Sequence, residues 1–174
     1  AIRFEFPDDH LEKLTVINPY GDKEILLSAG QIVISGDSGK TVVEGHSDSL
    51  HILNTNGAIE VKGHHTSAKA RTTNGAISFG GRSEQLMLET LNGAIRADLD
   101  ALSDAGELRM ATTTGAVVLH LPQTLPASTG AFVRSNLGSV KSDIALLEET
   151  QVRQKKVQIY IKSDVGSVRI EQEP

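Results

Sequence analysis

The stretch Leu50–Gly63 reads Leu-His-Ile-Leu-Asn-Thr-Asn-Gly-Ala-Ile-Glu-Val-Lys-Gly, and degenerate copies of it run along almost the whole chain. With its central glycine, Gly57, as the origin, apolar residues recur seven and five positions before the glycine and two and four positions after it. Apolar positions separated by two are typical of strands that bury one face. Self-similarity at a fixed period predicts a repeat architecture.

The turn glycines set the period of this repeat. Five of them follow one another at a spacing of 18 residues, and three more continue the series at intervals of 22, 23 and 28. The full set is Gly21, Gly39, Gly57, Gly75, Gly93, Gly115, Gly138 and Gly166. The extra residues fall in 98–107, 121–130 and 142–156, so we expect longer loops on otherwise similar coils.

A polar column interrupts the apolar ones, three residues before each glycine. Strand parity places it on the same side as the apolar columns, where buried polar groups must find hydrogen-bond partners. We therefore expect a ladder of side chains that caps the backbone of the turns. Its members are Asn18, Gly36, Asn54, Thr72, Thr90, Thr112, Ser135 and Ser163.

The pattern predicts an all-β fold, a right-handed β-solenoid of about eight coils whose 18-residue repeat lengthens toward the C-terminus. The alternative is an antiparallel β-meander of hairpins, because Asn-Gly between alternating runs is also a hairpin signal. A meander would have to cover its apolar face, and no amphipathic helix pattern is available to do so. The solenoid is favoured because each coil buries its own apolar residues against the next.

One domain is expected over 1–174. Residues 1–12 form an N-terminal cap, 13–97 form regular coils, and 98–174 form coils with longer loops and a C-terminal cap. A short helix is expected within 144–156, and residues 157–171 are expected to close the stack as its final strand pair.

Composition limits the functions that this chain can have. The net charge is −5 with no basic stripe in the sequence, which disfavours nucleic-acid binding. There is no cysteine, so disulfides and thiolate metal sites are excluded. No apolar run is long enough for a membrane span. We expect an exported protein, periplasmic or on the cell surface, whose signal peptide is not part of this chain.

Repeated Thr-x-Asn-Gly-x-Ile-x-Val units give the chain a family resemblance. They stand at 54–61 and 72–77, in part at 92–95, and more weakly at 113–117 and 136–140. The sequence resembles the bacterial adhesin-like β-strand-repeat family DUF4097. That resemblance implies a solenoid-like fold and a cell-envelope setting, and it carries over no catalytic residue.

Histidine is the best place to search for a metal site. His46 and His64 both lie seven residues after a turn glycine and should stack one coil apart, with His65 beside them. Two imidazoles at that spacing can share a Zn²⁺ ion. The next residue in the column is Arg82, which repels a cation, so our prediction is that no metal is bound.

An enzyme would need convergent acids. Asp98 and Asp100 share a strand parity, but they are expected in a loop and without a partner. We therefore predict no catalytic residue and no cofactor.

The function expected is a non-enzymatic, adhesin-like binding or scaffold module of the bacterial cell envelope. Its repetitive β-faces would contact a protein or glycan partner, with no nucleic acid and no membrane insertion. The alternatives are a self-assembling, bactofilin-like β-helix and a polysaccharide-active enzyme, and self-association into a homo-oligomer stays open.

Overall fold

The computed structural model describes residues 1–5 and 11–173, and these form a β-solenoid. Every strand pairing among the described residues is parallel. The antiparallel meander is therefore wrong. Its hairpin would have paired Ile52 with Val61, whereas Ile52 pairs with Ile34 and Ala70 in the two neighbouring coils.

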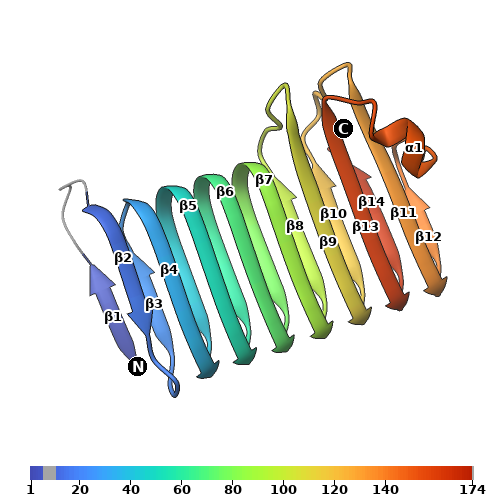
Figure 1. The fold of residues 1–174 in the computed structure, drawn as a ribbon. Coiled ribbons are helices and arrows are strands. Elements are labelled where there is room, and N and C mark those ends of the chain that lie inside the picture. Colours follow the sequence, from blue (N-terminus) through green and yellow to red (C-terminus); the bar gives the residue numbers. More distant parts are fainter. Residues whose placement is uncertain (6–10, 174) are drawn as a thin grey trace.

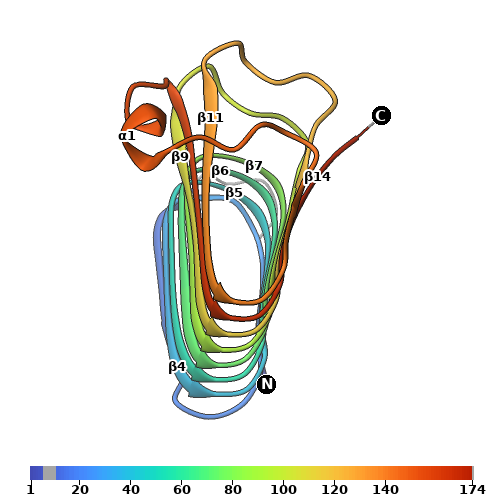
Figure 2. The same cartoon turned by 90° about the vertical axis from the view of Figure 1, so that its right-hand side faces the viewer.

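The coils are flattened, so the strands form two sheets that face each other across the core (Figure 2). We call these sheets face A and face B. Face A contains, in spatial order, β1 (Ile2–Glu5), β3 (Lys23–Leu26), the first parts of β5 (Thr41–Asn56), β6 (Ile59–Asn74) and β7 (Ile77–Asn92), then β8 (Ile95–Leu99), β10 (Val117–Leu121), β14 (Val168–Gln172) and β12 (Val140–Ser142). Face B contains β2 (Leu11–Ile17), β4 (Ala29–Ser38), the later parts of β5, β6 and β7, then β9 (Gly106–Thr114), β13 (Val157–Val165) and β11 (Thr129–Leu137).

The path of the chain is right-handed, as predicted. In Figure 1 the near strands run downward and the far strands run upward while the chain advances from the N-terminal end toward the right. Strands β5, β6 and β7 are each 16 residues long because they bend round a corner and contribute to both faces. Extended backbone at this corner lets one strand continue from face A into face B.

The core consists of the predicted apolar columns. The column five residues before the turn glycines includes Ile34, Ile52, Ala70 and Leu88, which are at most 2% exposed. Like side chains lie on like side chains because neighbouring coils pair in register. Complete burial of one Leu or Ile contributes about 1.5–3 kcal/mol, so each coil stabilises the next through several such residues.

The eight turn glycines stand in a single file along the solenoid. A Cβ atom placed on Gly75 would lie 2.1 Å from the carbonyl oxygen of Gly57 in the preceding coil. Glycine occupies most of these turn positions because a Cβ atom would not fit against the preceding coil, and not only because some of them have a left-handed backbone. Gly57 has φ +139°, but Gly75 is outside the group of glycines with positive φ.

From Asn54 onward the polar column forms the predicted ladder. Its side chains donate hydrogen bonds to the carbonyl oxygens of turn glycines in the preceding coil. The donor and acceptor pairs are Asn54 to Gly39 at 2.8 Å, Thr72 to Gly57 at 3.2 Å, Thr90 to Gly75 at 3.0 Å, Thr112 to Gly93 at 3.0 Å, Ser163 to Gly115 at 3.2 Å and Ser135 to Gly166 at 3.1 Å.

In the coil where the polar column holds Gly36, the side chain of Lys23 takes the place of the missing ladder side chain. Lys23 occupies an interior position and is 1% exposed. Its Nζ donates to the carbonyl oxygens of Gly21 and Ser38, both at 3.2 Å. A Cβ on Gly36 would lie 2.4 Å from Lys23 Nζ, so the missing side chain makes room for the lysine. Burial lowers the pKa of Lys23, with Asp22 and Asp37 opposing that shift.

The order of the last coils differs from the prediction. Residues 157–171 do not close the stack, because β13 pairs with both β9 and β11, and β14 pairs with both β10 and β12. The outermost coil is instead β11 with β12 (Figure 1). Burial explains this arrangement: Ile159 and Ile170 in the inserted coil are fully buried, whereas Val140 in the outermost coil is 41% exposed.

Short segments cover parts of both ends. β1 pairs with β3 at the N-terminal end, as the predicted cap requires, while residues 6–10 lie outside the described residues. Helix α1 (Glu149–Val152) confirms the short helix expected within 144–156. The segment before it pairs with β11, since Leu147 N donates to Ala131 O at 2.8 Å. None of the helical structure in residues 1–5 and 11–173 has the length and apolar character needed to span a bilayer.

Candidate functional site

The outward side chains of face B form a strip that is grooved toward the C-terminal end. We define the face B strip as the outward residues of β6, β7, β9, β13 and β11. Parallel pairing places residues of the same strand parity side by side. One row contains Lys69, Met87, Arg109, Tyr160 and Phe132. A second row contains Arg71, Glu89, Ala111, Lys162 and Arg134.

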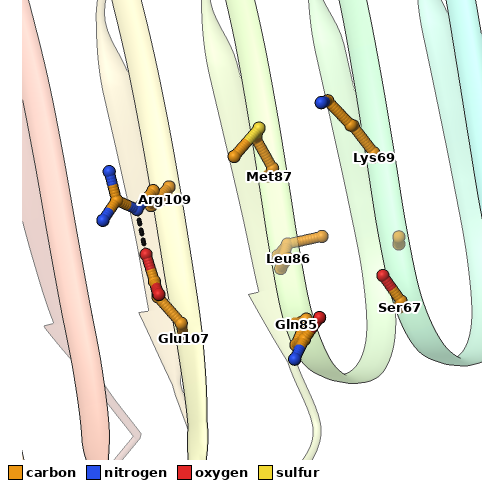
Figure 3. A pocket seen from close by; sticks show the side chains of 8 residues that line it. Ser67, Lys69, Gln85, Leu86, Met87, Glu107 and Arg109 are labelled. Atoms are coloured by element: carbon orange, nitrogen blue, oxygen red, sulfur yellow. Dashed lines mark hydrogen bonds and ion pairs between the residues drawn. The ribbon is translucent and has the colours of Figure 1, made fainter.

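A shallow pocket of about 260 Å³ opens the strip between β6 and β9. Figure 3 shows Lys69, Met87 and Arg109 on successive strands, with the Arg109 guanidinium directed to Glu107. The thioether of Met87 lies between two cations, so this pocket presents one apolar side chain in a charged rim. Arg109 also belongs to the next hollow along the strip, which makes the two continuous.

The larger of these two hollows, about 500 Å³, lies where α1 overhangs face B, and we call it the α1 groove. Figure 2 shows α1 outside face B beside β9 and β11. The side chains that line the groove come from four strands and from α1. They include Glu89, Arg109, Ala111, Phe132, Arg134, Glu149, Arg153, Gln158, Tyr160 and Lys162.

The inserted coil builds the floor of the α1 groove. Because β13 lies between β9 and β11, Tyr160 is in register with Arg109 on one side and with Phe132 on the other. The Arg109 guanidinium carbon lies 5.0 Å from the centre of the Tyr160 ring, a cation–π distance. In the next row the small side chain of Ala111 lies between Glu89 and Lys162 and leaves space above the sheet.

Gln158 fixes α1 above this floor. Its amide nitrogen donates to the carbonyl oxygen of Lys155 at 3.0 Å, and its amide oxygen accepts from the Tyr160 hydroxyl at 3.1 Å. Val152 of α1 is fully buried and anchors the helix from below. The groove wall is therefore held by both polar and apolar contacts.

The α1 groove is locally positive in a protein of net charge −5. Four cations line it against two carboxylates. Arg153 pairs with Glu149, Lys162 pairs with Asp164 and Arg109 pairs with Glu107, so within residues 1–5 and 11–173 the unpaired positive charge of the groove is that of Arg134. Arg134 is exposed and has no carboxylate partner among the described residues, and its guanidinium donates only to the Asn136 amide oxygen at 3.4 Å.

Face A carries a separate charged cluster that contains one of the predicted acids. Asp98 lies in β8 and not in a loop, which corrects the prediction. It also has partners: His120 Nδ1 contacts Asp98, and His120 Nε2 lies 2.7 Å from Glu171 Oε2. Arg96 Nε donates to Asp98 at 2.9 Å. Asp100 lines the same shallow pocket of about 470 Å³.

The chemistry available to this cluster is limited by its own contacts. Partial burial acts to raise the pKa of Asp98, but hydrogen bonds from Arg96 and His120 outweigh it and hold that pKa below its ordinary value. Both ring nitrogens of His120 face carboxylates, so neither is free to accept a substrate proton. The contacts favour a structural charge network over a general acid and base pair.

The histidine column has the predicted stack. The ring centroids of His46 and His64 lie 5.1 Å apart, and the angle between the ring planes is 25°. His65 lies on the interior side and is 2% exposed, with its Nδ1 at 2.8 Å from Ser47 Oγ, so it cannot join the other two around one ion. Burial, reinforced by His46 and His64, lowers the pKa of His65 to about 4. Among the described residues no group of three or more His, Asp or Glu side chains is placed to hold a metal.

Sequence reasoning named Asp98 and Asp100 of the face A cluster, but it missed His120 and Glu171 of the same cluster and every residue of the α1 groove. Asp98, His120 and Glu171 each lie five residues after a turn glycine, so aligning the coils by glycine would have shown that column. Tyr160 and Phe132 also share a column position, six residues before Gly166 and Gly138. Phe132 and Tyr160 belong to coils that are consecutive in the sequence, so their contact could be expected from the repeat alone. The contact of Tyr160 with Arg109 arises only because the coil of Tyr160 is inserted between those of Arg109 and Phe132.

A comparison of the chain with protein-family models, with curated proteins and with solved structures found no match.

Proposed function

We propose that this protein is a non-enzymatic binding or scaffold module and that the face B strip is its contact surface. The observation that carries the proposal is the α1 groove, where two aromatic rings and four cations line one hollow. Binding sites commonly combine concavity, aromatic surface and a few polar groups with fixed positions. The regular coils provide a rigid support, since residues on paired strands hold their spacing.

The charge network on face A supports the non-enzymatic part of the proposal. Glycoside hydrolysis needs one protonated acid and one free carboxylate on either side of a bond. Asp98 is held ionised by Arg96 and His120, and Glu171 is occupied by His120 and Arg169. Asp98 does not have the apolar surroundings that would keep it protonated as an acid.

The cell-envelope setting is part of the same proposal. It rests on the resemblance of the Asn-Gly repeats to adhesin-like β-strand-repeat proteins, and it includes export to the periplasm or cell surface. A protein or glycan of the envelope would then be the partner.

The test compares two variants with the same change in charge. Met87→Glu with Arg134→Glu alters the face B strip, whereas Ser78→Glu with Lys141→Glu alters face A. Immobilised proteins are titrated with purified envelope polysaccharides and envelope proteins. Binding lost only in the face B variant is expected. Equal binding by both variants and the native chain, or no binding by the native chain, would contradict the proposal.

The enzymatic alternative is checked with the same polysaccharides. No reducing ends are expected to appear on prolonged incubation. Turnover that disappears in Asp98→Asn would overturn the non-enzymatic assignment.

End-to-end assembly is a second candidate function. No strand pairs with the outer side of β12 among the described residues. Leu137 and Val140 in this outermost coil are 69% and 41% exposed. Unpaired edges with exposed apolar residues are templates for further strands. Fibres in negative-stain images that disappear in Val140→Lys would favour this function, and a monodisperse species in ultracentrifugation would oppose it.

A further inference from the structure

We infer that the α1 groove binds a saccharide that carries a carboxylate, such as a uronic acid unit of an acidic polysaccharide. The inference rests on the proposed binding function and assigns its ligand class. It starts from the scarcity of aromatic residues, since the chain has two Tyr, four Phe and no Trp. Two of these six, Phe132 and Tyr160, lie next to each other on the outward side of face B, and both are only partly buried.

The two rings offer adjacent apolar surface, a platform for a sugar, with the Arg109 guanidinium over one face of Tyr160. Tyr160 and Phe132 are register partners on neighbouring parallel strands, which lie roughly 4.8 Å apart. The flat C–H face of a pyranose can pack on such a pair, because an aromatic ring combines a large apolar surface with few rotatable bonds. Gln158 accepts the Tyr160 hydroxyl hydrogen bond and so limits rotation of that ring.

Arg134 supplies the charge recognition. It lies two residues after Phe132 on the same side of β11 and is in register with Lys162 on β13. Its guanidinium is exposed, has no carboxylate partner among the described residues and lines the groove. A guanidinium binds a carboxylate through two parallel hydrogen bonds, which selects for an acid over a hydroxyl. A uronate ring on the platform would present its carboxylate within the same hollow.

An acidic peptide is the competing ligand for a positive groove. A peptide uses edge backbone or apolar pockets, and β11 is already paired with β13 along the side that faces the groove. The paired rings favour a ring-shaped ligand over an extended peptide. We therefore assign the saccharide and keep the peptide as an outcome of the test.

The experiment uses three probes of similar length in titration calorimetry with the full chain. These are a hexamer of a uronic acid, the same hexamer with its carboxyl groups reduced to alcohols, and hexaglutamate. We expect binding of the uronate hexamer that weakens with added salt, and at least about tenfold weaker binding of the reduced hexamer. Equal affinity for the reduced hexamer would overturn the role of the carboxylate, and equal affinity for hexaglutamate would overturn the saccharide.

Matched variants locate the site. Arg134→Gln should weaken binding of the uronate hexamer about tenfold. Lys141→Gln removes the same charge from the opposite face of the same coil and should change the affinity less than about twofold. Equal effects of the two variants would mean that only net charge matters, and would overturn the site. Circular dichroism melting curves confirm that both variants fold.

The rings are tested separately from the charge. Tyr160→Phe should retain the affinity, whereas Tyr160→Leu should reduce it. If Tyr160→Leu binds the uronate hexamer as the native chain does, the rings serve only to support α1, and the platform is excluded. If the native chain binds envelope polysaccharides but not the uronate hexamer, the ligand class fails while the proposed function stands.

Discussion

The three regular coils and the C-terminal coils use the same fold in different ways. In β5 to β7 every coil has 18 residues, and identical side chains stack, as in the hydrogen-bonded ladder of Asn56, Asn74 and Asn92. From β9 onward an inserted coil, longer loops and a small residue at Ala111 break the repetition. The regular part therefore has smaller hollows, such as the one at Met87, while the irregular part has the larger α1 groove with its aromatic rings and with Arg134, which has no acidic partner in the described part of the chain.

The largest effect should come from the glycine file. Gly75→Ala places a Cβ 2.1 Å from the Gly57 carbonyl oxygen within the regular coils. We expect a loss of about 3 kcal/mol or more in the free energy of unfolding, because two backbones must separate. Urea denaturation measures it.

Two further glycines sharpen this prediction. Gly80 has only the Lys62 side chain near its added Cβ, at 4.0 Å, so Gly80→Ala should be nearly neutral. Gly138 makes the same close approach as Gly75, but in the outermost coil, which can shift outward. Gly138→Ala should therefore cost less than Gly75→Ala, and an equal cost would mean that both regions are equally rigid.

The next effect depends on pH and concerns His65, which is buried in a regular coil. Its pKa is about 4 in the folded protein against 6.5 when unperturbed, so the folded protein favours the neutral ring. The corresponding stability is present above pH 6.5 and is lost as the pH falls toward 4, by roughly 3 kcal/mol at most. Urea unfolding at a series of pH values measures this slope.

Variants separate His65 from other titrating groups. His65→Ser matches Ser47 and Ser83, its neighbours in the column, and should flatten the dependence of stability between pH 6.5 and 4. His51→Ser removes an exposed histidine and should leave the slope unchanged. An unchanged slope in His65→Ser would show that the buried ring is not the group responsible.

A smaller effect is expected where Lys23 interrupts the regular pattern. Lys23→Ile alone leaves two carbonyl oxygens without their donor, and Gly36→Thr alone places a side chain against the lysine. Each change should cost about 1–3 kcal/mol. The double variant removes the clash with the lysine and should recover part of that loss, while the contact of the new Cβ with the Asn18 carbonyl oxygen, at 2.9 Å, remains. Additive losses in a double-mutant cycle would show that the two positions are independent.

The smallest effect should come from the charge network on face A in the irregular part. His120→Gln removes the contacts to Asp98 and Glu171, but these side chains are 24%, 41% and 39% exposed. We expect less than about 1 kcal/mol, and less still in high salt. A loss greater than about 2 kcal/mol would mean that this network holds the inserted coil in place.

The sequence predicts much of the architecture. The 18-residue period, the apolar columns, the turn glycines and the capping residues at Thr72 and Thr90 all depend on neighbours one coil away. The repeat predicts such features because each coil packs against a neighbouring coil of similar sequence. The candidate site was less accessible, since the repeat gives column positions to Phe132 and Arg134 but not the coil order that places Tyr160 beside Arg109.

The sequence by itself determined that this protein is a stacked parallel coil with a mainly aliphatic interior and glycine turns. Only the tertiary structure decided that residues 157–172 fill the space between β9 and β11 and between β10 and β12. Backbone pairing is nearly the same for any two coils, so the repeat does not specify their order. The order follows from burial, because the coil richest in aliphatic residues takes the inner place, and this brings Tyr160 beside Arg109 and Glu171 beside His120.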